Sequence, residues 1–389
     1  MSLHNRKSKF YFLSAIIFIL ACFNVVLFLI NHNAIPGWNL VFKPDAPAVS
    51  QHIKKPDEVR GIYITAYTAG VSRFGELVDF VKNNNLNAAV VDIKSPKGEP
   101  AFLLKDSFLA QYNMSRPLYS VENIIAKLHQ NNIYAIARIA VFQDPYLVSK
   151  EPALALQWKN GGVWTDYKGV KWLDPTAFGV WQYNVTLARE AYERGFDEIQ
   201  FDYIRFPSDG NIEAIKYVKW DGKTPKAVEM EKFFSYVGGI LRREKIPVSA
   251  DLFGLVCCME NYDLGIGQVL ERALPHFDYV SPMMYPSHYS PGFVGKKNPA
   301  SYPYEVVKYS MDMANGKITR FAASSTPLRR GSAGQAVPLA KLRPWIQDFD
   351  IGDIYDTAKV QAQIKATRDT KAEGFLIWNA RNVYTELVH

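Results

Sequence analysis

The stretch DEIQFDYIRFPS, residues 197–208, decides the fold that we predict for this chain. Up to Asp202 its apolar and polar residues alternate, which is the pattern of a short strand with one buried face. The run breaks at Pro207, as a strand does where it passes into a loop. The stretch therefore predicts a strand that delivers Asp202, Tyr203 and Arg205 to one edge of a sheet. An ordinary ion pair between Asp202 and Arg205 is the alternative interpretation.

Segments of the same kind recur on both sides of this strand, separated by segments with a helical spacing of apolar residues. The predicted strands lie at 61–67, 88–95, 133–142, 197–208, 247–254, 278–290, 342–349 and 374–382. Many are continuous Val, Ile and Ala runs, which suit strands buried on both faces of a parallel sheet. No GxGxxG follows the first strand, so an open dinucleotide-binding sheet is not favoured. Eight strands alternating with helices predict a (β/α)8 TIM barrel over residues 59–389.

The composition is that of a globular protein, with 389 residues, 48% of them hydrophobic and 21% charged. Aromatic residues make up 14%, which suits a surface for flat, weakly charged ligands such as sugars, although aromatics also pack cores. The net charge is +7, but no Lys/Arg-rich run follows residue 58, so nucleic-acid binding is not predicted. Cys257 and Cys258 are adjacent and no CxxC pair occurs, which gives neither a disulfide framework nor a zinc pattern.

Residues 10–30, FYFLSAIIFILACFNVVLFLI, form an uncharged run long enough to cross a bilayer as a helix. The run is longer than the apolar region of a secretory signal, and no small-x-small cleavage site follows it. Basic residues precede it and none follows directly, which places residues 1–9 in the cytoplasm and the barrel outside. We therefore predict an uncleaved signal anchor followed by an extended linker over 31–58. A cleaved signal and a secreted protein are the alternative.

In a barrel of this kind the loops after the strands form the active-site face. Polar and aromatic residues gather at those positions of the sequence. The candidates are Asp92, Arg138, Asp202, Tyr203, Arg205, Asp251, Tyr285, His288, Gln347, Asp348, Trp378 and Asn379. We expect their side chains to converge on one hollow, with Trp378 as a platform for a sugar ring.

Two carboxyl groups facing each other across a sugar are the minimum for glycosidic cleavage. One protonates the leaving oxygen while the other attacks the anomeric carbon or activates water. Asp202 and Asp251 lie on consecutive predicted strands and are the candidate catalytic pair. Arg205 would keep Asp202 ionised, and an apolar setting beside Phe253 would raise the pKa of Asp251 toward that of an acid. The reverse division of roles stays open.

The other ten candidates are predicted to bind substrate, and each has a structural alternative. Asp92 would form a rim salt bridge with Lys94, Arg138 would only neutralise Asp202 or Asp92, and His288 would be an exposed loop residue. His288 is the one histidine near this face, whereas a hydrolytic metal site needs several grouped ligands. We therefore expect no metal and no cofactor. A metal-dependent hydrolase or aldolase, with its ion at His288, is a third interpretation.

Nine segments together are similar to a known family. They are VRGIYITAY, VVDIKS, FDEIQFDYIRFPSDG, SADLFG, GIGQ, DYVSPMMYPSHYSPG, NPASYPYEVV, LRPWIQDF and GFLIWNARNVY. In this order they resemble the putative glycoside hydrolase domain family of bacteria and archaea, which is distantly similar to the α-amylase-like glycosidases, over residues 59–386. The resemblance implies a (β/α)8 barrel in an exported, carbohydrate-active protein of the cell surface.

The resemblance also bears on the catalytic pair. Related amylase-like barrels place a nucleophilic carboxylate at the end of the fourth strand, where this chain has Asp202. They commonly use Glu at the end of the fifth strand, where this chain has the shorter Asp251. Glu260 on the following loop and Asp348 on the seventh strand are therefore alternative acids.

The sequence thus predicts a membrane-anchored, extracytoplasmic glycoside hydrolase that acts without a metal on a cell-envelope or extracellular polysaccharide. The alternative is a non-catalytic glycan-binding or envelope-scaffolding protein on the same barrel. Both predict glycan contacts at Tyr285 and Trp378, but only the enzyme needs two carboxyl groups facing one cleft.

Overall fold

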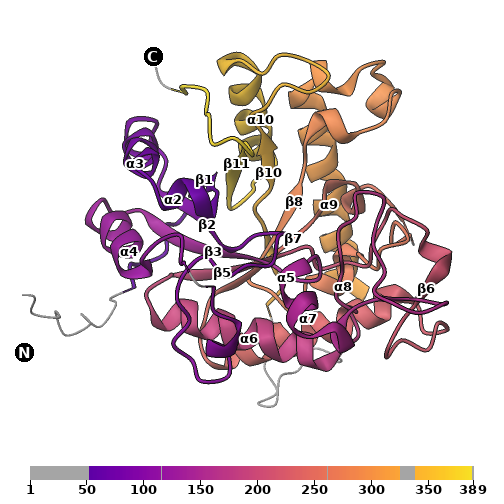
Figure 1. The fold of residues 1–389 in the computed structure, drawn as a ribbon. Coiled ribbons are helices and arrows are strands. Elements are labelled where there is room, and N and C mark those ends of the chain that lie inside the picture. Colours follow the sequence, from indigo (N-terminus) through magenta and orange to yellow (C-terminus); the bar gives the residue numbers. More distant parts are fainter. Residues whose placement is uncertain (1–51, 115, 261, 325–337, 388–389) are drawn as a thin grey trace, which may run out of the picture. The chain divides into compact units, whose positions relative to one another are not determined.

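The computed structural model describes residues 52–114, 116–260, 262–324 and 338–387 (Figure 1). The predicted cytoplasmic tail, the predicted membrane span at 10–30 and most of the linker lie outside these ranges. Within them, no helix combines the length and the apolar character that crossing a bilayer requires.

Eight strand positions close into a parallel barrel. The strands are β1 (Val59–Ile64), β2 (Ala88–Lys94), β3 (Tyr134–Ala140), β5 (Glu198–Asp202), β7 (Val248–Phe253), β8 (Tyr279–Met283), β9 (Lys341–Leu342), β10 (Trp345–Gln347) and β11 (Gly374–Trp378). Their order is β10-β11-β1-β2-β3-β5-β7-β8, and β8 pairs with β10 to close the ring. The short β9 also pairs with β8, so β9 and β10 share the seventh position. All eight predicted strands and the predicted (β/α)8 barrel are confirmed.

Helices cover the outside of the ring (Figure 1). They are α2 (Ala66–Ala69), α3 (Arg73–Asn83), α4 (Val121–Gln130), α5 (Pro145–Lys150), α6 (Phe178–Glu193), α7 (Lys226–Arg243), α8 (Leu270–Ala273), α9 (Pro303–Ser324) and α10 (Thr357–Asp369). Side-chain caps begin several of them: Asp144 Oδ1 accepts from Leu147 N–H at 2.7 Å, and Asp356 Oδ1 from Lys359 N–H at 3.0 Å. The helix predicted around 264–274 shrinks to the four residues of α8.

Residues 379–387, which follow β11, form no helix where the eighth of the barrel would stand. They run back across β1 instead. Asn382 accepts a hydrogen bond from Thr65 N–H and donates one to the Tyr63 carbonyl, both at 2.9 Å. The last described residues therefore stabilise the closure of the barrel between β11 and β1, which pair directly.

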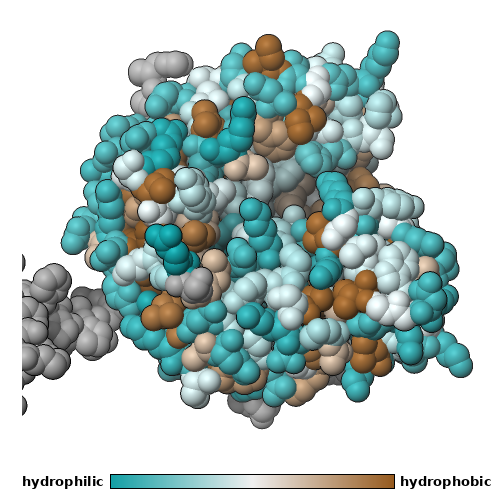
Figure 2. Space-filling view, in the orientation of Figure 1, coloured by the Kyte–Doolittle hydropathy of each residue, from teal (hydrophilic) through white to brown (hydrophobic). Residues whose placement is uncertain are grey.

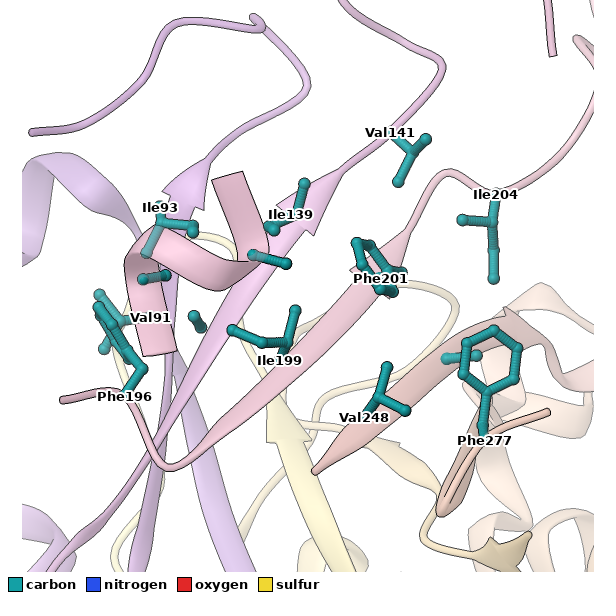
Figure 3. Close-up of a cluster of buried hydrophobic side chains, with 14 of the residues drawn as sticks. Val91, Ile93, Ile139, Val141, Phe196, Ile199, Phe201, Ile204, Val248 and Phe277 are labelled. Carbon is teal, nitrogen blue, oxygen red and sulfur yellow. The ribbon is translucent and has the colours of Figure 1, made fainter. Parts of the chain in front are cut away.

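Alternation along the strands divides their side chains between two layers. On the outer face, Val91, Ile139, Ile199 and Val248 come from four neighbouring strands and pack in the apolar layer under the helices (Figure 3). The inner face is mixed, with an apolar cluster that includes Tyr63, Ile136, Trp345 and Leu376 and with charged groups above and below it. The face of the molecule in Figure 2 is mainly hydrophilic, with hydrophobic residues interspersed.

One buried ion pair lies inside the barrel near the amino-terminal ends of the strands. Glu198, the first residue of β5, pairs with Arg343, which stands between β9 and β10. Both side chains are fully buried, and Ser249 on β7 donates to Glu198 Oε1 at 2.6 Å. We call Glu198, Ser249 and Arg343 the base cluster.

Candidate active site

A second charged group lies at the opposite end of the barrel, where four neighbouring strands end. It consists of Asp92 on β2, Arg138 on β3, Asp202 on β5 and Asp251 on β7, and we call it the mouth cluster. All four side chains are buried although they belong to a predicted active-site face. Three carboxyl groups share one guanidinium, so the negative groups outnumber the positive one.

Arg138 occupies the centre of the mouth cluster. Its Nη1 donates to Asp92 Oδ1. Its Nη2 and Nε reach Asp202 Oδ2 at 2.5 and 3.2 Å, and Nε lies 3.8 Å from Asp251 Oδ2. Because both oxygens lie close to the same Nε, the Oδ2 atoms of Asp202 and Asp251 are at most about 7 Å apart, which does not exceed the widest separation of paired carboxyl groups in glycosidases.

The two oxygens of Asp251 have different surroundings. Oδ1 accepts from Gln200 Nε2 at 2.7 Å and from Trp345 Nε1 at 2.8 Å. Oδ2 is buried and has no hydrogen-bond partner among the described residues. Burial, and next the negative charge of Asp202, raise the pKa of Asp251 well above its ordinary value. The direction agrees with the prediction, and the charge of Asp202 adds to the effect of burial.

The chain leaves β5 by a sharp turn at Tyr203. Its backbone is left-handed, with φ at +53°, which is uncommon for a bulky residue and costs roughly 1–3 kcal/mol. The turn aims Tyr203 N–H at Asp202 Oδ1, at 2.5 Å. A donor is thereby fixed on the carboxyl oxygen that Arg138 leaves free.

The same turn keeps Arg205 out of direct contact with Asp202, although the two charges still attract each other. No ion pair joins Arg205 to Asp202 or to any other described residue, because the strand alternation ends at Asp202 and the chain turns away. Arg205 Nη1 donates instead to the Phe206 carbonyl at 3.0 Å and to Ser208 Oγ at 3.2 Å. Arg138 is the residue that compensates the charge of Asp202.

The rim salt bridge between Asp92 and Lys94 is also not formed. The pairing of β2 with β3 shifts register between these two residues, so their side chains diverge. Asp92 receives a 2.5 Å hydrogen bond from Tyr63 Oη as well as its contact with Arg138, while Lys94 pairs with Asp144 at 2.6 Å. Burial raises the pKa of Asp92, against the opposing effect of Arg138.

Aromatic rings surround the guanidinium of Arg138. Trp378 stacks on Tyr63 with ring centroids 4.0 Å apart, and Trp345 stands perpendicular to Trp378 at 5.4 Å. Tyr285 lies 6.5 Å from Trp378. Trp378 is half-buried with one ring face on Tyr63, so at most its other face is left for a sugar. Tyr285 and Trp378 therefore lie beside the mouth cluster, and their contact with substrate stays a prediction.

Three other predicted residues hold loops together and do not join the mouth cluster. Gln347 Oε1 accepts from Ser287 N–H at 3.1 Å. Both carboxyl oxygens of Asp348 accept hydrogen bonds from Thr385. Asn379 donates a hydrogen bond to the backbone carbonyl of Asp348. These bonds link the loops that follow β8, β10 and β11.

Two further candidates lie away from the carboxyl pair. His288 is exposed, with its ring against Tyr285 and Phe349. Glu260, considered as an alternative acid, forms an exposed ion pair with Arg320 on α9. Asp348 is engaged by Thr385 as described, so neither alternative acid meets Asp202.

Sequence reasoning missed three residues of this site: Tyr63, Gln200 and Trp345. Each lies on the inner face of its strand, and Gln200 stands two positions before Asp202 on the same face. That spacing was the feature of the sequence from which Gln200 could have been identified. In the part of the chain that is described, no group of three or more His, Cys, Asp or Glu side chains is arranged to hold a metal ion. Arg138 fills the space between the three carboxyl groups of the mouth cluster.

Comparison with known proteins bears on both fold and family. Residues 61–384 match the model of a family described as "Putative glycosyl hydrolase domain". The PgaB (BpsB) glycoside hydrolase domain from Bordetella bronchiseptica superposes with a TM-score of 0.56 at 15% identity, over 83% of this chain and 94% of that one. The catalytic domain of β-amylase from Paenibacillus polymyxa gives 0.50 at 11%, over 86% and 95%. At such identities both show the fold alone.

A shorter protein is closer in sequence. A hypothetical protein from Ruminiclostridium thermocellum ATCC 27405 is 36% identical over 49% of this chain and 96% of its own, with a TM-score of 0.44. No curated protein matches the chain.

Proposed function

Because the chain belongs to the family described as a putative glycosyl hydrolase domain, we propose that it is a glycoside hydrolase whose active site is the mouth cluster. One observation carries the proposal. Asp202 and Asp251 come from adjacent strands, their Oδ2 atoms are at most about 7 Å apart, and the two groups have different hydrogen-bond partners. Two such carboxyl groups suffice for acid-assisted cleavage of a glycosidic bond.

The surroundings assign a role to each group. Asp251 is the acid: its raised pKa favours the protonated form, and its unbonded Oδ2 can pass that proton to the glycosidic oxygen. Asp202, compensated by Arg138, attacks the anomeric carbon or activates a water molecule. Once Asp251 has lost its proton, Arg138 Nε at 3.8 Å lies near enough to compensate that carboxylate too.

The substrate that we propose is a polysaccharide of the cell envelope or the extracellular space. The rings of Trp378 and Tyr285 beside the acids support a sugar ligand, since aromatic faces pack well on the apolar faces of sugars. Arg138 between the acids supports a mechanism that needs no metal. The proposal includes a membrane anchor at residues 10–30 with the barrel outside the cell, or a secreted protein if that segment is removed.

The direct test is to incubate the full-length protein with envelope polysaccharides and measure the release of reducing ends. Asp202→Asn should lower turnover by at least about 10⁴-fold, as expected for the loss of a nucleophile or base. Asp348→Asn makes the same chemical change on a carboxyl group bonded to Thr385 and should keep turnover. An unchanged rate in Asp202→Asn would eliminate Asp202 from the chemistry.

The role of Asp251 has its own test. Asp251→Asn should slow cleavage of an alkyl glycoside by about 10²–10⁴-fold, the usual contribution of general acid catalysis. A nitrophenyl glycoside of the same sugar needs little protonation of its leaving group and should lose much less. Equal losses on the two substrates would exchange the roles of Asp202 and Asp251.

One observation favours the alternative of a glycan-binding or scaffolding protein without turnover. Asp251 is 1% exposed and Asp202 6%, which is little for groups that must reach a polymer. The alternative predicts glycan binding that Asp202→Asn leaves unchanged and no release of reducing ends. Turnover that depends on Asp202 would exclude it.

A further inference from the structure

Arg205 lies next to the mouth cluster in an aromatic cage formed by three segments of the chain. Its guanidinium carbon is 4.8 Å from the ring centroid of Trp172, 5.2 Å from Phe253 and 5.7 Å from Tyr203. Trp172 is fixed in turn by a 3.1 Å hydrogen bond from its Nε1 to Asp166. The cage therefore holds the guanidinium in one place.

Arg205 differs from the buried arginines of this protein because no carboxylate is bound to it. Arg138, Arg194 and Arg343 each form an ion pair with a buried acid, which is Glu190 for Arg194. Arg205 forms none within the described ranges, and its Nε and Nη2 donate to no described residue. Its Nη1 alone is occupied, by the Phe206 carbonyl and Ser208.

This cation is partly withdrawn from water but still charged. Burial lowers the pKa of Arg205, yet a guanidinium in a protein keeps its proton at any physiological pH. Aromatic faces offset part of the lost hydration, but they satisfy none of the remaining N–H donors. Two donors in a fixed planar fork match the two oxygens of a carboxylate or phosphate.

The position of the cage connects it to the proposed active site. Phe253 stands two residues after Asp251 on β7, about 7 Å along the strand, and Tyr203 directly follows Asp202. A saccharide held at the two acids thus carries its ring substituents, or those of the next sugar, past Arg205. Resting on the function proposed above, we propose that Arg205 is a specificity-determining residue that binds an anionic group, carboxylate or phosphate, on the glycan.

Binding to matched pairs of oligosaccharides tests this assignment. The full-length Asp202→Asn protein is titrated by calorimetry with a panel of uronate-containing oligosaccharides, each beside its carboxyl-reduced twin. A second panel pairs phosphate-bearing glycans with their dephosphorylated twins. We expect at least one acidic member to bind tenfold or more tighter than its twin, and the panel it belongs to identifies the anion. Equal affinities throughout, or no binding by any acidic member, would overturn the proposal.

Variants at Arg205 separate recognition from support of the loop. In the same protein, Arg205→Gln should abolish the preference for the acidic twin, and Arg205→Lys should keep part of it because the charge remains without the planar fork. Ser208→Ala removes only a contact within the loop and should keep the full preference. If Ser208→Ala loses the preference as Arg205→Gln does, Arg205 acts by shaping the loop and the proposal fails.

The outcome is separable from that for the proposed function. Equal affinities for the twins of every pair, together with glycan turnover that depends on Asp202, would refute the role of Arg205 and leave the hydrolase in place. A preference for acidic glycans that depends on Arg205, without turnover of any glycan, would refute the hydrolase and leave the anion site in place.

Discussion

The two ends of the barrel interior differ in how their buried charges are balanced. In the base cluster one guanidinium meets one carboxylate: Arg343 Nη1 donates to Glu198 Oε2 at 3.1 Å, Nη2 donates to Oε1, and Ser249 adds a further bond. In the mouth cluster one guanidinium serves three carboxyl groups. Among the described residues each cluster leaves a buried atom without a hydrogen bond, Arg343 Nε in the first and Asp251 Oδ2 in the second, so the two clusters differ in their balance of charge. A balanced pair is explained by folding alone. An excess of buried acid is a burden on folding, so its presence indicates a function.

Removing one partner from the base cluster should have the largest effect on stability. Arg343→Gln leaves Glu198 buried without its counter-charge, and such a loss costs about 3–5 kcal/mol. Urea unfolding followed by circular dichroism measures it. Glycan binding by the molecules that remain folded should be unchanged, because Arg343 lies at the opposite end of the barrel from Asp202.

The matched control for that variant removes both charges together. Glu198→Leu with Arg343→Met replaces the pair by apolar side chains and should recover most of the lost stability, as such replacements often do for buried pairs. A loss below about 1 kcal/mol in Arg343→Gln would show that the base cluster is not the structural pair that we describe.

At the mouth cluster we expect a substitution to raise stability, whereas at the base cluster it lowers stability. The pKa of Asp251 is raised by folding, so the folded state binds more protons than the unfolded state between the ordinary and the raised pKa. The stability that this proton supplies is fully present below about pH 4 and is lost as the pH rises through the raised pKa. Asp251→Asn removes the loss and should gain about 1–3 kcal/mol over the wild type at high pH, the usual cost of a buried unsatisfied group.

Urea unfolding of both proteins from pH 4 to pH 9 checks this difference. The two stability curves should separate as the pH rises, with the variant above the wild type. Parallel curves would mean that Asp251 titrates alike in the folded and unfolded states, and the contrast between the two ends of the barrel would disappear.

The smallest effect is expected outside both clusters. Glu260→Gln breaks the exposed ion pair with Arg320, and pairs of this kind contribute roughly 0–1 kcal/mol. Turnover should be unchanged, because Glu260 does not meet Asp202. A large loss of turnover with normal stability would instead identify Glu260 as the catalytic acid. Asp251 would then have a structural role only.

The barrel was predictable because every strand carries its own signal. Alternation in EIQFD, with Ile199 and Phe201 outward, also predicts that Gln200 and Asp202 share the inner face, and the structure confirms both layers. Adjacent strands then bring Asp202 and Asp251 together. The pairing of the two acids therefore follows from period and strand order alone.

The remaining details depend on backbone geometry that composition does not reveal. The left-handed turn at Tyr203 separates Arg205 from Asp202, and the register shift in β2 separates Asp92 from Lys94. In both cases an ion pair between residues close in sequence was the structural alternative to a role at the site, and that pair does not form. The bond between Asp348 and Thr385 could not be predicted for another reason, since Thr385 is a loop residue with no pattern of its own.

The return of residues 379–387 over the first strand matters for how the protein is made. Synthesis proceeds at roughly 5–20 residues per second from the amino terminus, so β1 leaves the ribosome long before β11 and Asn382, which complete its hydrogen bonds. During that interval the nascent chain carries an incomplete ring whose first strand has one edge open to pairing with other chains. The ring can close only after residue 382 has been made, so the interval before closure is when misassembly of this protein should be sought.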